Sequence, residues 1–152
     1  MSGTSIAFNE NFDYSFSMQY SVEISTRKRE QLVDITDRVA DAVASSGIRN
    51  GLAHIFVQGA TAGIMVQENW DDSVQNDVIS MLKKHIPQGV WEHDRQDGNG
   101  DAHLKSGLVG PSELVPIIDG QLGLGRWQNL FFCEFDGPRS IRKIVVTVTK
   151  DN

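Results

Sequence analysis

The sequence predicts an α+β domain built largely on antiparallel sheet, a sandwich-like fold with two main helices. Residues 16–24 alternate apolar and polar side chains with the period of two that a half-buried strand requires. Only two segments have helical periodicity, and strands and helices do not alternate as they do around a parallel sheet. A chain of 152 residues suffices for one core. We therefore expect a single domain over residues 1–152, with residues 1–13 as a loosely ordered arm.

The elements of the first half follow from apolar spacing. One face of the first strand carries Phe16, Met18, Tyr20, Val22 and Ile24. A solvated bend of mixed charges at residues 27–30 follows it. A helix then begins near Thr36, with Val39, Ala42 and Val43 on one face, and ends at Gly47.

The middle of the chain predicts two strands and a second helix. Residues 52–57 and 64–67 are short apolar runs on either side of a small-residue loop, residues 58–63. Ser73 resembles an N-cap, and Pro87 ends the helix that follows. The inner stripe of this helix is Val74, Val78, Met81, Leu82 and His85.

The last third of the chain predicts a hairpin and two further strands. Residues 115–118 and 122–124 flank Asp119-Gly120, a pair typical of tight hairpin turns. Residues 127–135 and 141–149 are the closing strands. Glu134 lies within an apolar run, and because desolvation disfavours its charged form we expect it to face a polar neighbour, water or a subunit interface.

Composition narrows the function classes. The chain has 14 basic and 20 acidic residues and a net charge of −6. This charge argues against nonspecific electrostatic binding to nucleic acid or to an anionic membrane. Cys133 is the single cysteine, so no intrachain disulfide forms, and we interpret its thiol as a buried apolar group rather than a nucleophile. There is no signal-peptide pattern and no uncharged apolar run near the ~20 residues that span a bilayer. We expect a cytoplasmic protein.

The densest polar stretch is residues 97–112, in which two aspartates, an asparagine, a histidine, a lysine and two serines are interleaved with four glycines. A glycine-rich loop can bend tightly and present backbone N–H groups to an anion. We interpret it as a phosphate-binding loop; the alternative is a solvated connection with local turn hydrogen bonds. The phosphate-binding candidates are Asn99, Lys105, Ser106, Gly110 and Ser112, with Arg139 from a neighbouring turn.

A divalent metal is a second interpretation of the same region. His93 and His103 bracket several oxygen donors, and two neutral imidazoles with one carboxylate can hold zinc, magnesium or manganese while leaving a position open. The spacing matches no short metal motif, so a hydrogen-bonded polar loop remains the alternative. Glu68, Asp101 and His103 are the candidate catalytic residues for proton transfer. Glu68 precedes a helix, and its alternative role is to stabilise the helix N-terminus.

Many motifs occur in order along the chain. They are Gly51-Leu52-Ala53-His54-Ile55-Phe56-Val57, Ala60-Thr61-Ala62-Gly63-Ile64, Glu68-Asn69, His93, Asp97-Gly98-Asn99-Gly100-Asp101-Ala102-His103-Leu104-Lys105, Leu108-Val109-Gly110-Pro111-Ser112, Val115-Pro116, Asp119-Gly120, Leu124-Gly125-Arg126-Trp127-Gln128 and Cys133-Glu134-Phe135-Asp136-Gly137-Pro138-Arg139. Together they resemble the YjbQ family, also called the UPF0047 or secondary thiamine-phosphate synthase family. The resemblance covers about residues 16–148.

The resemblance implies a compact α+β homotrimer with polar residues near subunit interfaces and with His93 and His103 as metal ligands. It also implies weak thiamine-phosphate synthesis, in which the nitrogen of a thiazole phosphate displaces pyrophosphate from a hydroxymethylpyrimidine pyrophosphate. Many relatives carry Pro-His-Thr-Thr where this chain has Gln58-Gly59-Ala60-Thr61. A mechanism that needs that imidazole is in doubt here.

The leading hypothesis is therefore a small cytosolic enzyme that acts on a phosphorylated small molecule, with a divalent ion stabilising the departing pyrophosphate. One alternative is a non-catalytic, trimeric metabolite- or metal-binding protein. Another is a metal-dependent phosphohydrolase. Neither nucleic acid nor membrane is an expected partner.

Overall fold

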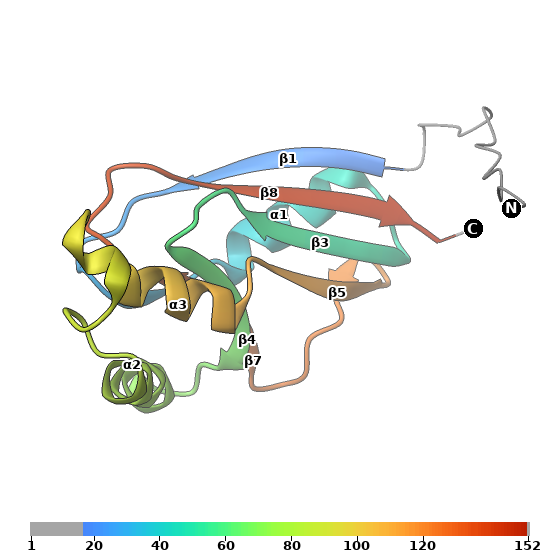
Figure 1. Cartoon of the computed structure of the whole chain (residues 1–152). Helices are drawn as coiled ribbons and strands as arrows, with labels where there is room; N and C mark the ends of the chain where they lie inside the picture. Colours follow the sequence, from blue (N-terminus) through green and yellow to red (C-terminus); the bar gives the residue numbers. More distant parts are fainter. Residues whose placement is uncertain (1–16, 152) are drawn as a thin grey trace, which may run out of the picture.

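Two antiparallel sheets form the framework of the computed structural model, which describes residues 17–151 (Figure 1). In order across the first sheet, the strands are β1 (Ser17–Ile24), β8 (Arg142–Lys150), β3 (Gly51–Val57), β5 (Ser112–Ile118) and β6 (Gln121–Leu122). The second sheet contains β2 (Gln31–Asp34), β7 (Gln128–Glu134) and β4 (Ala62–Glu68). The helices are α1 (Thr36–Ser46), α2 (Ser73–His85), α3 (Gly100–Val109) and the short 3-10 helix η2 (Glu92–Arg95). The α+β class is confirmed, and the expected arm, residues 1–13, lies outside the described residues.

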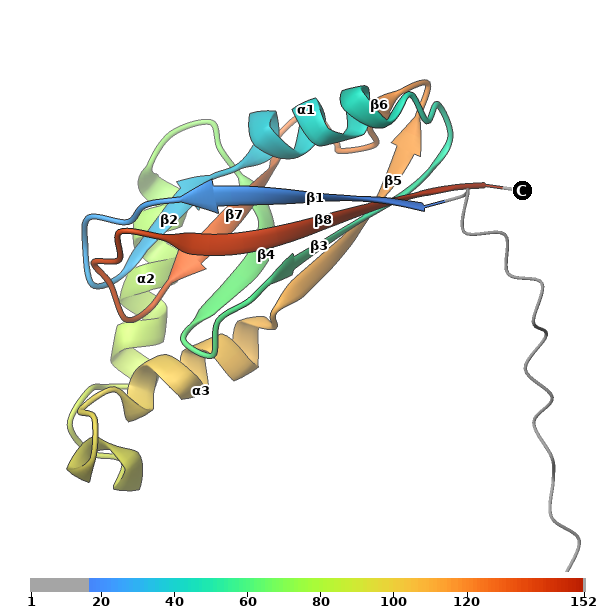
Figure 2. The ribbon, with the colours of Figure 1, turned by 90° about the horizontal axis from the view of Figure 1, so that it is seen from above.

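The first core lies between the two sheets, and α1 packs into it near β6 (Figure 2). Its buried members from the first sheet include Ala53, Ile55, Val115, Ile117, Ile144, Val146 and Val148, and those from the second include Ile64, Leu130 and Phe132. The expected apolar face of α1 is confirmed by the burial of Val39, Ala42 and Val43. Gly47 ends α1 with a φ of 67°, a left-handed conformation that glycine adopts at little cost.

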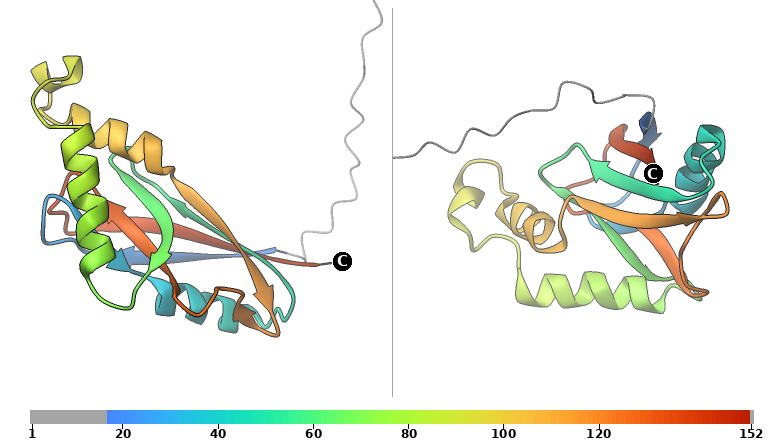
Figure 3. Two further views of the ribbon diagram at one scale, coloured as in Figure 1. Left: turned by 90° about the horizontal axis from the view of Figure 1, so that it is seen from below. Right: turned by 90° about the vertical axis from the view of Figure 1, so that its right-hand side faces the viewer.

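The second core lies on the other face of the second sheet. Phe131 and Cys133 of β7 alternate with Leu130 and Phe132, so this strand buries both faces and its sequence is continuously apolar. Helices α2 and α3 cover this face together (Figure 3). Cys133 is fully buried, and burial raises the pKa of its thiol to about 12, so its expected structural role is supported.

The runs at residues 52–57 and 64–67 form strands, as expected. Because β3 and β4 belong to different sheets, the loop between them crosses from one layer to the other. Two expectations for α2 need correction. On α2 the buried face uses Val78, Ile79 and Leu82, whereas Met81 and His85, both expected on the inner stripe, are exposed. The N-cap of α2 is Asp72 rather than Ser73.

The most consequential correction concerns the polar stretch. Most of residues 97–112 form the helix α3 rather than a loop, which makes a third main helix where two were expected. Ala102 is fully buried in the second core, and Val109 packs against that core, so tertiary burial outweighs the low helix propensity of Gly100 and Gly107.

The last hairpin is as expected. β5 and β6 pair across Asp119 and Gly120, whose φ values of 52° and 83° are those of a tight hairpin turn. None of the helices formed by residues 17–151 is long and apolar enough to cross a membrane.

Candidate functional site

The carboxylate of Asp94 joins η2 to the start of α3. Its two oxygens each lie 2.8 Å from a backbone nitrogen, Oδ2 from that of Trp91 and Oδ1 from that of Gly100. These N–H donors, first that of Trp91, lower the pKa of Asp94. Gly100 is required for this approach, because a Cβ there would lie 2.8 Å from the Cβ of Trp91. The helix N-terminus is thereby occupied by a carboxylate of the same chain.

The junction of η2 and α3 brings His93 and His103 together. Their ring centroids are 4.9 Å apart, and the rings are nearly perpendicular. Nε2 of His93 lies 3.5 Å from Oδ2 of Asp97, and the His93 side chain is 42% exposed. The two imidazoles therefore form a solvent-accessible pair on one side of α3. Within residues 17–151, no group of three or more His, Cys, Asp or Glu side chains is arranged to hold a metal ion.

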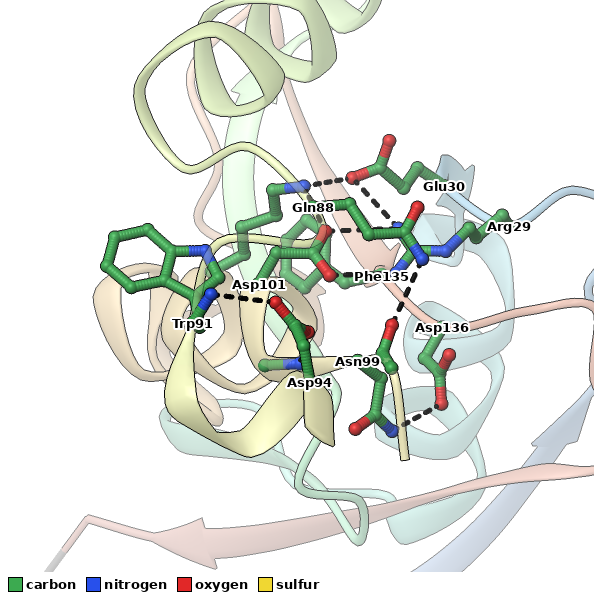
Figure 4. Close-up of polar contacts among 12 residues, drawn as sticks. Arg29, Glu30, Gln88, Trp91, Asp94, Asn99, Asp101, Phe135 and Asp136 are labelled. Carbon is green, nitrogen blue, oxygen red and sulfur yellow. Dashed lines mark hydrogen bonds and ion pairs between the residues drawn. The ribbon is translucent and has the colours of Figure 1, made fainter. Parts of the chain in front are cut away.

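A buried ion network occupies a different face of α3 (Figure 4). Asp101 accepts hydrogen bonds from Nη2 and Nη1 of Arg29 at 2.8 and 3.1 Å, and from Nζ of Lys105 at 2.7 Å. Lys105 also bonds Glu30, whose other oxygen lies 3.1 Å from Nζ of Lys83. Burial alone would raise the pKa of Asp101, but the hydrogen bonds from Arg29 and Lys105 lower it. Asp101 is therefore a carboxylate held in its charged form.

The network and the histidine pair are separate. At about 100° per residue, His103 lies roughly 200° around the helix axis from Asp101. The three candidate residues His93, His103 and Asp101 are thus close in sequence, but they do not share one face of α3. The charged partners Arg29, Glu30 and Lys83 were not predicted as site residues. The sequence signal for Arg29 and Glu30 is the run of mixed charges at residues 27–30, which is also the pattern of a solvated bend, and Lys83 lies in the last turn of α2.

The predicted phosphate-binding residues are not gathered at one point. Lys105 is bonded within the network, and the hydroxyl of Ser106 donates to the carbonyl of Ala62 at 2.7 Å. Gly110 ends α3 with a φ of 95°, and its carbonyl accepts from the backbone N–H of Ile64. Ser112 is the first residue of β5. Ser106 and Gly110 thus attach α3 to β4, and Lys105 attaches it to the β1–β2 connection.

Two further candidates meet at Asp136. The Nδ2 of Asn99 and the Nη2 of Arg139 both donate to Oδ2 of Asp136, at 3.0 and 2.6 Å. Since the carboxylate can only accept, Asn99 must turn its Oδ1 away from it, and this atom has no hydrogen-bond partner within residues 17–151. The unpartnered group of Asn99 is therefore a hydrogen-bond acceptor, whereas the oxygens of a phosphate need a donor.

Glu68 lies apart from the other catalytic candidates. It is the last residue of β4, whereas Ala62, at the other end of the strand, contacts Ser106 of α3. Six residues of extended strand span about 20 Å. Glu68 is exposed, and its backbone carbonyl accepts from the side chain of Gln75 on α2. The structure gives Glu68 no contact with His103 or Asp101.

The sequence of this chain is similar to those of known proteins from one family. Residues 20–151 match the family model described as UPF0047 protein YjbQ-like. A UPF0047 protein of Methanocaldococcus jannaschii is 46% identical over 134 residues, which cover 88% of this chain and 96% of the relative. The chain belongs to the YjbQ/UPF0047 family. The Bacillus subtilis UPF0047 protein YugU is 40% identical over 126 residues, covering 81% of this chain and 93% of the relative.

Solved structures of the YjbQ type have the same fold. A YbjQ-like protein of unknown function from Sulfolobus solfataricus superposes with a TM-score of 0.85 at 37% identity, covering 89% of this chain and 98% of that one. A Clostridium acetobutylicum member of the YjbQ/UPF0047 family gives a TM-score of 0.79 at 41% identity, covering 86% of this chain and 98% of that one. The fold expected from the resemblance is confirmed.

The YjbQ-like segment around Thr61 adjoins a second buried ion pair. Glu134 is fully buried, and Nε and Nη2 of Arg142 bind its two oxygens, Nε at 2.8 Å and Nη2 at 2.5 Å. Arg142 also donates to the hydroxyl of Thr61 at 3.0 Å. Glu134 thus has the polar neighbour that we expected. At Gly59, where the family resemblance implies a histidine in many relatives, a Cβ would lie 3.1 Å from Nη1 of Arg142, so a larger residue would displace the Arg142 guanidinium.

Proposed function

We propose that this protein is a small enzyme that acts on a phosphorylated small molecule, with the His93–His103 pair at its reacting centre. The observation that carries the proposal is the meeting of two accessible imidazoles from separate elements, 4.9 Å apart between ring centroids. Histidine changes charge near neutral pH, so such a pair can exchange protons with a substrate or donate hydrogen bonds to phosphate oxygens. The rigid attachment of η2 to α3 through Asp94 keeps the two rings in place.

The side chains around the histidine pair supply some, but not all, of the ligands that a divalent metal needs. Imidazole nitrogens and a carboxylate oxygen are ligands that zinc accepts, and His93, His103 and Asp97 would be the residues that hold it. Catalytic zinc usually has three protein ligands, whereas no converging group of three was found within residues 17–151. Magnesium or manganese bound mainly through substrate phosphates needs fewer protein ligands. When bound, the ion would neutralise charge on a departing phosphate group.

The finer proposal is a thiamine-phosphate synthase-like transfer. The ring nitrogen of a thiazole phosphate would form a bond to the methylene carbon of the pyrimidine, while the bond from that carbon to the pyrophosphate oxygen breaks. The pair of electrons from the broken bond leaves with pyrophosphate. A protonated His103 or His93 would donate a hydrogen bond to the leaving group. Membership of the YjbQ/UPF0047 family supports this proposal.

A binding protein without catalysis is the second candidate. Its support is that Asp101 and Lys105 are bonded to each other and that Glu68 stands at the far end of β4. The histidine pair would then hold a ligand, and neither of the carboxylates proposed for proton transfer, Asp101 and Glu68, lies beside it. An enzyme loses turnover when the pair is broken, whereas a binder loses ligand affinity alone.

Assembly as a homotrimer belongs to the same proposal. The outer face of the first sheet pairs Leu52 with Pro116 and His54 with Leu114 across β3 and β5. Leu52 and Leu114 are 41% and 58% exposed, and Phe56 is 39% exposed. No helix of residues 17–151 packs on this apolar face, which a neighbouring subunit would cover. A cytoplasmic location accords with the single, buried cysteine.

One experiment tests the enzyme proposal. Metal content per subunit and thiamine-phosphate formation would be measured for wild type, His103→Ala and His85→Ala, the last removing an exposed histidine at the end of α2. We expect His103→Ala alone to lose turnover, with an unchanged circular dichroism spectrum. Equal turnover in the three proteins would refute a role for the pair. Ligand binding without turnover in wild type would favour the binding protein.

A further inference from the structure

A cavity of about 300 Å³ lies beside the buried ion network, on a different side of α3 from the histidine pair. Its lining residues are Arg29, Glu30, Lys83, Pro87, Gln88, Asp101 and Lys105. Figure 4 shows Gln88, Arg29 and Glu30 converging around Asp101. The volume is at the lower end of the range typical of small-ligand sites. Two loops and two helices meet here, so the cavity is formed only in the folded chain.

The charges around this cavity do not balance. Three cations, Arg29, Lys83 and Lys105, face two carboxylates, Glu30 and Asp101. Lys105 is only 1% exposed in its side chain, and Asp101 is fully buried. The side chains of Lys83 and Arg29, by contrast, are 58% and 31% exposed, so the one positive charge in excess is carried by cations that face solvent at the cavity.

The hydrogen-bond donors are also in excess. A lysine ammonium has three N–H donors and an arginine guanidinium has five. Lys105 uses its donors on Glu30 and Asp101, Lys83 contacts Glu30, and Arg29 binds Asp101 with two nitrogens. Each of the three cations thus keeps at least one N–H donor. The amide nitrogen of Gln88 donates to the carbonyl of Gly98 at 3.0 Å and keeps its second N–H. The two carboxylates, by contrast, already accept from Arg29, Lys83 and Lys105.

We propose that this cavity is a binding site for a phosphate group, either inorganic phosphate or the phosphate of a small phosphomonoester. A phosphate supplies negative charge opposite the partly exposed Arg29 and Lys83, together with several acceptor oxygens, and it matches the fork of Arg29 and the point charges of the two lysines. The site is separate from the His93–His103 pair and does not depend on the proposed reaction. It gives Lys105 the anion-binding role expected from the sequence, but with partners from the β1–β2 connection and α2.

Two neighbouring lysines provide the test. Lys83 and Lys84 both lie in the last turn of α2 and are exposed, yet only Lys83 lines the cavity. Lys83→Gln and Lys84→Gln therefore remove the same charge from the same helix end. Binding of inorganic phosphate, and separately of phenyl phosphate, would be measured by calorimetry in a phosphate-free buffer. We expect Lys83→Gln to weaken binding about tenfold, the loss typical of one charge-assisted hydrogen bond, and Lys84→Gln to leave it unchanged.

Every outcome bears on the proposal. An equal loss in both variants would show general electrostatic attraction and overturn the site. No binding at millimolar phosphate in wild type, or the same binding in Lys83→Gln, would also overturn it. A shift of the Gln88 side-chain amide resonance on adding phosphate would locate the ligand without any mutation. His103→Ala should bind phosphate normally, so failure of the proposed reaction and failure of this site can be told apart.

Discussion

Replacement of Asp101 by asparagine is the sharpest test of the buried network. The carboxylate accepts three N–H bonds, two from Arg29 and one from Lys105. Asparagine has nearly the same shape, but it has no charge and its amide group would face these cations. The side chain of Lys105 is 1% exposed and would be left with Glu30 alone.

The expected loss of unfolding free energy is about 3 kcal/mol, the lower end of the range for breaking a buried ion pair from one side. We take the lower end because the Arg29 side chain is 31% exposed and can turn toward water. For a chain of this size, that loss corresponds to a fall in Tm of roughly 6–12 °C. Urea unfolding followed by tryptophan fluorescence, at one fixed protein concentration, measures it.

Asp97→Asn is the matched control. It removes the same charge four residues away, where the side chain is 66% exposed, and should change the free energy of unfolding by less than about 0.5 kcal/mol. If Asp101→Asn costs no more than this control, the network contributes nothing measurable and the reasoning is wrong.

The same comparison has a defined pH dependence. Because the pKa of Asp101 is lower in the folded than in the unfolded chain, its stabilisation is fully present above the ordinary aspartate pKa. It is lost as pH falls through the lowered folded value. The free-energy difference between wild type and Asp101→Asn should therefore be constant from neutral pH down to about 5 and shrink in stronger acid. A difference that grows on acidification would contradict the assigned sign.

Three other expectations can be checked on the same protein. Gly100→Ala should destabilise the chain by about 1–3 kcal/mol in urea unfolding, because a Cβ there meets Trp91; a gain in stability would show that α3 has room to shift. The thiol of Cys133 should resist iodoacetamide in the folded protein and react in urea, since burial keeps it protonated; fast labelling of folded protein would refute this. Arg142→Met should lower the free energy of unfolding by about 3–5 kcal/mol, because it leaves Glu134 buried without a cation. The double variant Arg142→Met with Glu134→Gln should recover part of that loss. Additive losses from the two substitutions would show that the two groups are not coupled.

Local patterns were sufficient for much of the fold. The alternation of β1 past residue 16, the apolar face of α1 and the Asp119-Gly120 turn each follow from the nearest neighbours in sequence, because the strand period, the helix period and positive φ are local properties. The burial of Cys133 followed from its apolar run. The family resemblance was likewise carried by the order of short motifs.

The polar stretch shows where local reasoning failed. Four glycines and many polar groups are typical of a loop, yet residues 100–109 are helical because Ala102 is buried and Asp101 pairs with Lys105 one turn along α3. The partners that make this favourable, Arg29 and Glu30, are some seventy residues away in the chain. A charge that seems solvated in a sequence can thus belong to a buried network.

The sequence by itself determined the fold class, the family and the residue types that could carry chemistry. Only the tertiary structure decided how those residues group. It brought His93 and His103 together, moved Asp101 and Lys105 to another face of the same helix, and left Glu68 at the far end of β4. The physical reason is that a helix turns neighbouring residues by about 100° and a sheet pairs distant ones, so closeness in sequence does not set which side chains share a site.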